Sequence, residues 1–456
     1  MRLTLEQIAR ATGGRILKTE QESFNAFGID SRKIGQGDLF FAIRGEHTDG
    51  HLFVADAFQR GAGGAIVDQP GFSAEGGRTI IQVQDSMKAL QDLGAFVRRE
   101  NTARFIGITG SSGKTSTKEF TAALLSQRYR VFKSEGNLNS LTGLPLSLLS
   151  LESCECAVFE VAMNNPGEIA RLSSVLKPDI GAILNVNPVH SLQFPSIDAI
   201  ADEKCSLVEG MARDSLLVFN ADDPLLLERL QKRQAGFTYG FSSGADLRIT
   251  DVRMKGVSGS QAVFRWNQEH VEVHTALCGI GNITNIACAV AVAVNLNLTS
   301  EEIGRGINEL KPYQQRGVLI TSGDIAIYDD TYNSNPRAVD LALRIVSESR
   351  GYRRRIAVLG DMLELGAGEK QFHEAAGEQV AAGGFDALVT AGPLSRHTAE
   401  AAQRKGVKAV YAEKDSTEAA ERIKSIARPG DLILVKGSRG MKMETVVKRL
   451  QTAGAE

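Results

Sequence analysis

The chain has few of the features that mark secreted, zinc-binding or nucleic-acid-binding proteins. Its 456 residues include only five cysteines, Cys154, Cys156, Cys205, Cys278 and Cys288, an odd number with no zinc-like spacing beside histidines. Reduced structural thiols are therefore expected. The formal net charge is −2, which argues against general binding to nucleic acids or membrane surfaces. A polyanionic ligand would have to be held by local positive groups.

The sequence also has no long apolar run. Its first segment, MRLTLEQIARATGG, predicts a short amphipathic helix that ends in two glycines, and it lacks the apolar stretch of a signal peptide. No other stretch approaches the length that a membrane-spanning helix needs. We therefore expect a cytoplasmic protein without membrane insertion.

The length predicts three domains, because a domain usually takes about 150 residues. We place them at 1–98, 99–312 and 313–456. Each alternates short β-rich runs with helical stretches, which predicts an α/β fold of mainly parallel sheets covered by helices. Residues 245–275 differ, because short polar and apolar runs alternate there between glycine-rich turns. That pattern predicts an antiparallel appendage.

Apolar and β-branched runs locate the expected strands of these domains. They are 38–42, 64–67, 79–83, 104–109, 157–161, 180–186, 216–220, 325–328, 355–360, 387–391, 408–411 and 431–435. The last five predict a doubly wound, Rossmann-like C-terminal domain. No Gly-x-Gly-x-x-Gly follows a strand there, so no dinucleotide is assigned to it.

The strongest motif is a glycine-rich turn between a predicted strand and a helix, Gly107-Ile-Thr-Gly-Ser-Ser-Gly-Lys-Thr-Ser116. Small residues let backbone N–H groups approach a phosphate chain, and a helix N-terminus faces its charge. The spacing departs from the strict P-loop pattern, since Ile108 stands six residues before Lys114. We predict that Lys114 reaches the β- and γ-phosphates of ATP and that the Thr115 hydroxyl binds magnesium. The expected ATP-binding residues of this loop are Thr109, Gly110, Ser111, Ser112, Gly113, Lys114, Thr115 and Ser116.

A P-loop alone does not specify a reaction, because kinases, GTPases, motors and ligases all use one. Two further residues lie at or just after the ends of predicted strands, where open α/β sheets place ligand-binding groups. Glu160 lies in the run AVFEVAM, and His190 follows the strand 180–186 by a short loop. A carboxylate and an imidazole there could hold magnesium directly or through water. A single loop histidine is, however, more often a surface or packing residue.

The series TGSSGKTST, Glu160, His190 and Lys204 resembles the central domain of the Mur ligase family, and the resemblance extends over essentially the whole chain. It implies ATP-driven formation of an amide bond. It also implies that Glu160 and His190 bind magnesium, and that Lys204 is carbamylated and supports a second magnesium ion. The catalytic residues implied are Lys114, Glu160, His190 and Lys204, and the metal-binding set is Thr115, Glu160, His190 and Lys204.

The same resemblance implies further nucleotide contacts outside the P-loop. Asn282 and Asn285, in GIGNITN, resemble the paired asparagines near the adenine, with Gly281 where a histidine is usual. Arg316, in YQQRG, resembles the family arginine although its loop differs. Asp330 lies at a predicted strand end and is suited to ribose hydroxyls. Asn282, Asn285, Arg316 and Asp330 are therefore expected to bind ATP.

Segments in the first and third parts resemble family members that add D-alanyl-D-alanine to a UDP-muramoyl tripeptide. The runs DSR, GDLFFAI and DGH resemble their uridine-nucleotide-binding domain, and GNLN with TGLP resembles their substrate loop. In the third part, DDTYNSNP, LGDMLELG and VKGSRGM resemble their signatures. The substrate-binding residues implied are Ser31, Arg32, Asp49, Asn137, Asn139, Thr142, Tyr332, Asn333, Asn335, Lys436 and Arg439.

The residues alone leave plainer interpretations open. DDTYNSNP could be a capped turn between strand and helix, and Lys436 with Arg439 a solvated basic turn. Asp361 and Glu364 could cap the following helix. Alternative functions are another Mur enzyme, a folate polyglutamate-type ligase, a P-loop regulator that switches partners, or a scaffold. We expect a monomer that acts on small molecules.

Overall fold

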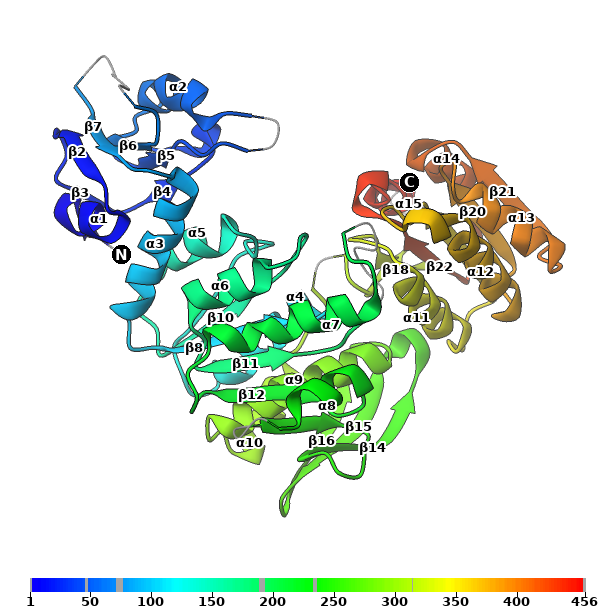
Figure 1. The fold of residues 1–456 in the computed structure, drawn as a ribbon. Coiled ribbons are helices and arrows are strands. Elements are labelled where there is room, and N and C mark those ends of the chain that lie inside the picture. Colours follow the sequence, from blue (N-terminus) through cyan, green and yellow to red (C-terminus); the bar gives the residue numbers. More distant parts are fainter. Residues whose placement is uncertain are drawn as a thin grey trace.

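A computed structural model describes residues 2–45, 48–70, 77–187, 193–232, 236–313 and 315–453. Their strands form sheets of two, five, nine and six strands. Figure 1 shows the five-stranded sheet in blue, the nine-stranded sheet in the cyan and green part and the six-stranded sheet in the yellow-to-red part. Helices cover the sheets, and the predicted α/β fold class is confirmed.

The N-terminal sheet has the order β2-β7-β6-β5-β4 and stands beside the β1-β3 pair. Its strands are β1 (Leu3–Thr4), β2 (Arg15–Lys18), β3 (Ser23–Phe24), β4 (Phe27–Gly28), β5 (Leu39–Phe41), β6 (Gly64–Val67) and β7 (Thr79–Gln82). The helices are α1 (Leu5–Thr12), α2 (Val54–Gln59) and α3 (Ser86–Arg99), with 3₁₀ turns η1 (Ser31–Lys33) and η2 (Gly50–Phe53). The predicted amphipathic helix is α1, which the Thr4 side chain caps and Gly13 ends at φ 63°.

The middle sheet has the order β16-β15-β14-β13-β12-β11-β8-β10-β9. Its strands are β8 (Arg104–Thr109), β9 (Val131–Lys133), β10 (Cys156–Glu160), β11 (Ile180–Ile183), β12 (Leu216–Asn220), β13 (Gly236–Gly240), β14 (Leu247–Met254), β15 (Ser260–Trp266) and β16 (Glu269–Thr275). The helices are α4 (Lys114–Leu125), α5 (Gly143–Leu149), α6 (Glu168–Leu176), α7 (Ile197–Cys205), α8 (Pro224–Leu230), α9 (Ile280–Asn295) and α10 (Ser300–Asn308).

Strands β8 to β13 are parallel, whereas β14, β15 and β16 pair antiparallel to one another. The antiparallel prediction for residues 245–275 is therefore confirmed. These strands are not a separate unit, however, because β14 pairs with β13 and extends the same sheet. The predicted strand 180–186 ends at Ile183, since Asn185 turns toward the glycine-rich loop and accepts its hydrogen bonds.

The C-terminal sheet has the order β17-β18-β22-β19-β20-β21 and is parallel except for β17. Its strands are β17 (Val318–Ser322), β18 (Ile325–Asp330), β19 (Arg354–Gly360), β20 (Ala387–Ala391), β21 (Ala409–Glu413) and β22 (Asp431–Lys436). The helices are α11 (Pro336–Ser347), α12 (Glu369–Ala382), α13 (Arg396–Arg404), α14 (Ser416–Ile426) and α15 (Glu444–Ala453). Apolar clusters cover both faces, as a doubly wound sheet requires.

The hydrophobic cores show which sheets are joined. One continuous cluster runs from Phe24 and Phe41 in the first sheet, through Leu93 and Phe96 of α3, to Phe159 in the middle sheet. Figure 1 shows α3 leading from one sheet to the other. The two clusters of the third sheet draw almost all their described members from residues after 325. The exact domain boundaries stay a prediction.

Among the described residues, no helix is both long and apolar enough to cross a lipid bilayer.

Candidate active site

A cavity of 1070 Å³ lies between the middle and C-terminal domains. Its walls come from the carboxyl ends of strands in both sheets, which is where open α/β sheets place ligands. The first turns of α9 and α11 complete it. The structure brings together in this lining Ser111, Ser112, Gly113, Lys114, Thr115, Ser116, Asn137, Asn139, Glu160, Asn282, Asn285, Arg316, Asp330, Tyr332, Asn333, Asn335 and Lys436.

The glycine-rich loop joins β8 to α4, as predicted, and α4 begins at Lys114. Gly113 has φ +84°, and a Cβ built there would stand 2.4 Å from the Asn285 side-chain oxygen. Only glycine meets both conditions without strain. The Lys114 Nζ donates to the Gly110 carbonyl oxygen at 2.8 Å. Burial and the nearby Arg316 charge lower the pKa of Lys114, while the Glu160 carboxylate raises it.

Glu160 lies at the centre of a hydrogen-bonded cluster and is 4% exposed. Its carboxylate accepts from the Thr115 hydroxyl at 2.8 Å and from the Asn139 amide at 2.9 Å. Arg316 donates from Nη2 to the Thr115 hydroxyl at 3.1 Å, and its guanidinium lies 3.9 Å from the centroid of the Tyr332 ring. Residues from the loop, from β10 and from the third domain therefore meet at one point.

Lys204 lies in the last turn of α7 and is 2% exposed. Its Nζ is 3.7 Å from the Met163 sulfur. Burial, together with the charge of Lys114, lowers the pKa of Lys204 well below its ordinary value. The adjacent Glu203 raises it, but that carboxylate accepts from the backbone N–H groups of Gly167 and Ile169 at 2.7 and 2.8 Å.

In the third domain, the predicted basic residue Lys436 is 2% exposed. Its Nζ donates to the Asp330 carboxylate at 2.6 Å and to the Asn333 carbonyl oxygen at 2.8 Å. Lys436 is therefore a buried, paired cation and not the solvated turn of the alternative interpretation. Asn335 caps α11 by accepting from the Ala338 N–H at 2.9 Å, so the capped-turn interpretation is correct for that residue.

The predicted nucleotide-sugar residues lie in the N-terminal domain, outside the cavity lining. Asp30 accepts from the Arg32 backbone and guanidinium, and these hydrogen bonds lower the pKa of Asp30 to about 2. Ser31 is buried beside Arg32 in η1.

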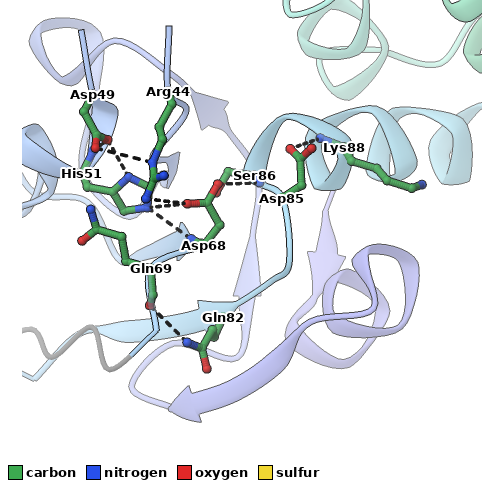
Figure 2. A network of polar contacts seen from close by, with 9 residues as sticks. All are labelled: Arg44, Asp49, His51, Asp68, Gln69, Gln82, Asp85, Ser86 and Lys88. Carbon is green, nitrogen blue, oxygen red and sulfur yellow. Dashed lines mark hydrogen bonds and ion pairs between the residues drawn. The ribbon is translucent and has the colours of Figure 1, made fainter.

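Asp49 belongs to the polar network of Figure 2. Its carboxylate caps η2 and accepts from the His51 ring at 2.7 Å. The other ring nitrogen of His51 accepts from the Asp68 N–H at 3.2 Å. The Arg44 guanidinium lies within ion-pair distance of the carboxylates of Asp49 and Asp68. The Asp49 side chain therefore holds the fold of its own loop.

Other predicted residues lie outside the cavity lining. Thr109, Gly110, Thr142, Lys204 and Arg439 belong to this group. His190 lies outside the described residues.

Arg439 contributes to the site indirectly. Its guanidinium donates to the Gln315 side chain at 2.9 Å, and the Gln315 carbonyl oxygen accepts from the Tyr332 N–H. Arg439 therefore supports the loop that carries Tyr332.

Sequence reasoning missed polar residues that line the cavity, among them Asn185, Asp222 and Arg337. Asn185 lies two residues after the end of β11, so the strand-end rule that selected Glu160 would have found it had the predicted strand 180–186 ended at Ile183. Asp222 follows β12 in the same way. Arg337 follows Pro336 at the start of a helix, where the sequence alone gives no sign of a ligand.

Family models match most of the chain. The description "Mur ligase middle domain" matches residues 108–293, and "Mur ligase, glutamate ligase domain" matches 315–439. "Mur ligase family, catalytic domain" matches 23–98.

Curated relatives match at full length. The UDP-N-acetylmuramoyl-tripeptide--D-alanyl-D-alanine ligase of Bacillus subtilis (strain 168) is 34% identical over 457 residues, covering 98% of each chain. The relative of the same name from Escherichia coli (strain K12) is 32% identical and covers 99% of each.

Solved structures also match over nearly the whole chain. A crystal structure of MurF from Acinetobacter baumannii has a TM-score of 0.90 at 28% identity and covers 99% of both chains. MurF ligase from Thermotoga maritima in complex with ADP has a TM-score of 0.83 at 28% identity, covering 94% of this chain and 98% of that one.

Proposed function

Since the chain belongs to the Mur ligase family, we propose that it joins D-alanyl-D-alanine to UDP-N-acetylmuramoyl-tripeptide at the expense of ATP. The products are UDP-N-acetylmuramoyl-pentapeptide, ADP and phosphate, which makes this a step of peptidoglycan precursor synthesis. The carrying observation is the full-length match to ligases of that name, 34% identical over 98% of both chains. A cavity built around a phosphate-binding loop supports it.

The chemistry requires that a carboxylate oxygen become a leaving group. The tripeptide's terminal carboxylate attacks the γ-phosphate of ATP, giving an acyl phosphate and ADP. The amine of D-alanyl-D-alanine then attacks the acyl carbon, loses its proton, and phosphate leaves. The protein acts mainly by positioning the reactants and offsetting charge. Lys114, Arg316 and the backbone N–H groups of the loop would offset the phosphate charge, which their place in the cavity lining supports.

The residues around Glu160 fit a magnesium ion. Magnesium prefers oxygen ligands and is usually held by one or two carboxylates together with substrate phosphates. The Thr115 hydroxyl and the Glu160 carboxylate supply such oxygens 2.8 Å apart, although the described residues contain no group of three or more metal-binding side chains. Bound there, magnesium would neutralise phosphate charge. His190 completes the proposed ligand set.

Lys204 is proposed to be carbamylated and to support a second magnesium ion. Carbon dioxide reacts with a neutral amine, and a buried ammonium with a lowered pKa loses its proton more readily. Lys204 meets this condition, with 2% exposure and a thioether as its neighbour. The carbamate would bring a negative group toward the cations Lys114 and magnesium.

The substrate ends are proposed to bind at opposite sides of the reacting atoms. Ser31, Arg32 and Asp49 would hold the uridine diphosphate, and Asn137, Asn139 and Thr142 the peptide. Tyr332, Asn333, Asn335, Lys436 and Arg439 would hold D-alanyl-D-alanine, while Asn282, Asn285, Arg316 and Asp330 contact ATP. Because the cavity walls come from two domains, closure of the third domain would complete the site.

The test is phosphate release from ATP and magnesium with UDP-N-acetylmuramoyl-tripeptide, measured with and without D-alanyl-D-alanine. We expect release that needs both substrates and a pentapeptide product of the matching mass. Lys114→Met should abolish release. Release that ignores both substrates would instead indicate a P-loop regulator, and release supported by a pterin polyglutamate acceptor would indicate the folate-type ligase.

A further inference from the structure

Arg337 is a positively charged residue that does not belong to the phosphate-binding loop and that the fold of its helix does not require. It is the second residue of α11, after the cap Asn335 and Pro336. A positive side chain in the first turn lies near the positive end of the helix dipole, which is unfavourable for the helix. Helix formation therefore does not favour an arginine there. Its side chain lines the cavity between the two domains.

The guanidinium of Arg337 crosses from the third domain to the middle domain. It donates from Nη1 to the Asn187 side-chain oxygen, which lies 150 residues earlier in the chain. Asn187 is 8% exposed, and its Nδ2 donates to the Asn185 side-chain oxygen at 2.9 Å. These two contacts fix the orientation of the Asn187 amide, because its nitrogen faces Asn185 and its oxygen faces the arginine.

The two asparagines continue this contact into the phosphate-binding loop. The Asn185 oxygen also accepts from the Ser112 backbone N–H at 3.0 Å and from the Ser112 hydroxyl at 3.1 Å. The Asn187 N–H donates to the Ser111 hydroxyl at 2.8 Å, and that hydroxyl donates to the Asn187 carbonyl oxygen at 3.1 Å. A charge on α11 is thus connected, through the buried amide of Asn187 and the partly buried amide of Asn185, to two loop residues at the phosphate site.

We infer that Arg337 is a positioning residue that aligns the third domain on the nucleotide through Asn187. Helix α11 begins at the end of the DDTYNSNP turn. The Arg337–Asn187 contact sets the position of this helix relative to the phosphate-binding loop. Hydrogen bonds to an ionised donor are about twice as strong as neutral ones, which suits a contact that must re-form whenever the domains meet. This inference rests on the proposed function for its kinetic readout.

The kinetic test compares Arg337→Met, Asn187→Ala, the double variant and Arg344→Met. Arg344 is the matched control, since it lies on the same helix and pairs only with Asp340 among the described contacts. We expect kcat to fall roughly tenfold in Arg337→Met and in Asn187→Ala, the loss of one charged hydrogen bond. The KM for ATP should stay within about twofold, and the double variant should be no slower than either single one.

Two further variants separate the parts of the contact. Arg337→Lys keeps a charged donor and should recover part of kcat. Asn187→Asp keeps an acceptor for Arg337 but removes the donor to Asn185, so it should behave like Asn187→Ala. An Arg337→Met enzyme as active as Arg344→Met, or losses that simply add in the double variant, would overturn the inference.

A second readout does not depend on ligation. Hydrogen exchange of residues 336–343 is measured with and without ADP in wild type, Arg337→Met and Arg344→Met. We expect ADP to protect this first part of α11 in wild type and in the control, and not in Arg337→Met. Equal protection in all three would contradict the inference. If wild type shows the protection but forms no pentapeptide, the proposed function fails and the inference stands.

Discussion

Lys204 combines deep burial with a pKa well below its ordinary value, so its charge is costly in the folded state. Between the folded pKa and 10.5, the unfolded chain binds the proton and the folded chain does not. The stability associated with this group therefore rises with pH across that window and is lowest below the folded pKa. Each unit of pKa lowering corresponds to about 1.4 kcal/mol.

For the enzyme whose Lys204 is not carbamylated, we predict that Lys204→Met raises the free energy of unfolding at neutral pH; it should also lower ligase activity about 100-fold or more. The gain in stability should shrink as pH rises toward 10.5. Thermal unfolding over a pH series, beside ligation rates, measures both. A loss of stability in Lys204→Met would contradict the argument.

Lys118→Met is the matched control. Lys118 is equally buried at 0% exposure, but its Nζ donates to the Ser134 carbonyl oxygen at 2.6 Å. Removing it leaves a buried carbonyl unpaired, so this variant should lose about 1–3 kcal/mol. Both substitutions replace a buried lysine by methionine, and we expect them to change the free energy of unfolding in opposite directions.

Gly113 tests the backbone of the phosphate-binding loop. Gly113→Ala must place a side chain at φ +84° and 2.4 Å from Asn285, so we expect ATP affinity to fall about tenfold or more. Nucleotide titration measures it. Gly281→Ala is the control, because a Cβ there comes within 4 Å of Leu341 alone among the described residues, at 3.8 Å. Equal affinities of the two variants would refute the steric argument.

At the scale of single residues, the sequence predicted cavity-lining residues that a local rule marks, while their roles stay a prediction. The loop motif marks Lys114 and Thr115, and a strand end marks Glu160. Arg337 and Asn187 meet across 150 residues, and no local pattern records which amide an arginine will reach. Asp49 is the opposite case. A family-like segment marks it as a substrate-binding residue, but in the structure its side chain stabilises its own loop.

Helix α11 contributes to the cavity lining, and its start depends on the Asn335 cap. We predict that Asn335→Ala costs about 1 kcal/mol of stability. If Asn335 also binds substrate as proposed, the KM for D-alanyl-D-alanine rises as well. Thermal unfolding and substrate titration separate the two effects.

Asp415→Ala is the corresponding control, because Asp415 caps α14 in the same domain, outside the cavity lining. It should lose similar stability without any change in that KM. An Asn335→Ala enzyme with an unchanged KM would reduce Asn335 to a helix cap.

The sequence predicts the strands that consist of a clear apolar run, and it does not predict the short strands that lack one. The strands at β6, β8, β12 and β20 have the predicted bounds, because apolar runs there are buried on both faces. The short strands β2, β3 and β4 were missed. All four residues of β2 are exposed, so no burial pattern distinguishes it from a loop.

In the molecule as a whole, the first two domains are packed together more extensively than the third is packed against them. The first and middle sheets share one apolar cluster through α3, whereas the third sheet has almost entirely its own clusters and meets the middle domain around the cavity. We predict two calorimetric unfolding steps without ligand, because cooperativity follows continuous cores. ADP with UDP-N-acetylmuramoyl-tripeptide should bring the steps together. A single transition without ligand would show that the contact between the domains is stronger than we infer.

The missing side chain at Gly281 bears on the design of inhibitors. In the part of the chain that the structure describes, a Cβ in place of its hydrogen would meet only Leu341 within 4 Å. A compound that competes with ATP and directs a small group toward this position would therefore find room here. In an enzyme with a large side chain at this place, the same group would collide with that side chain. The absence of one side chain thus offers a basis for selectivity among enzymes that share the same reaction.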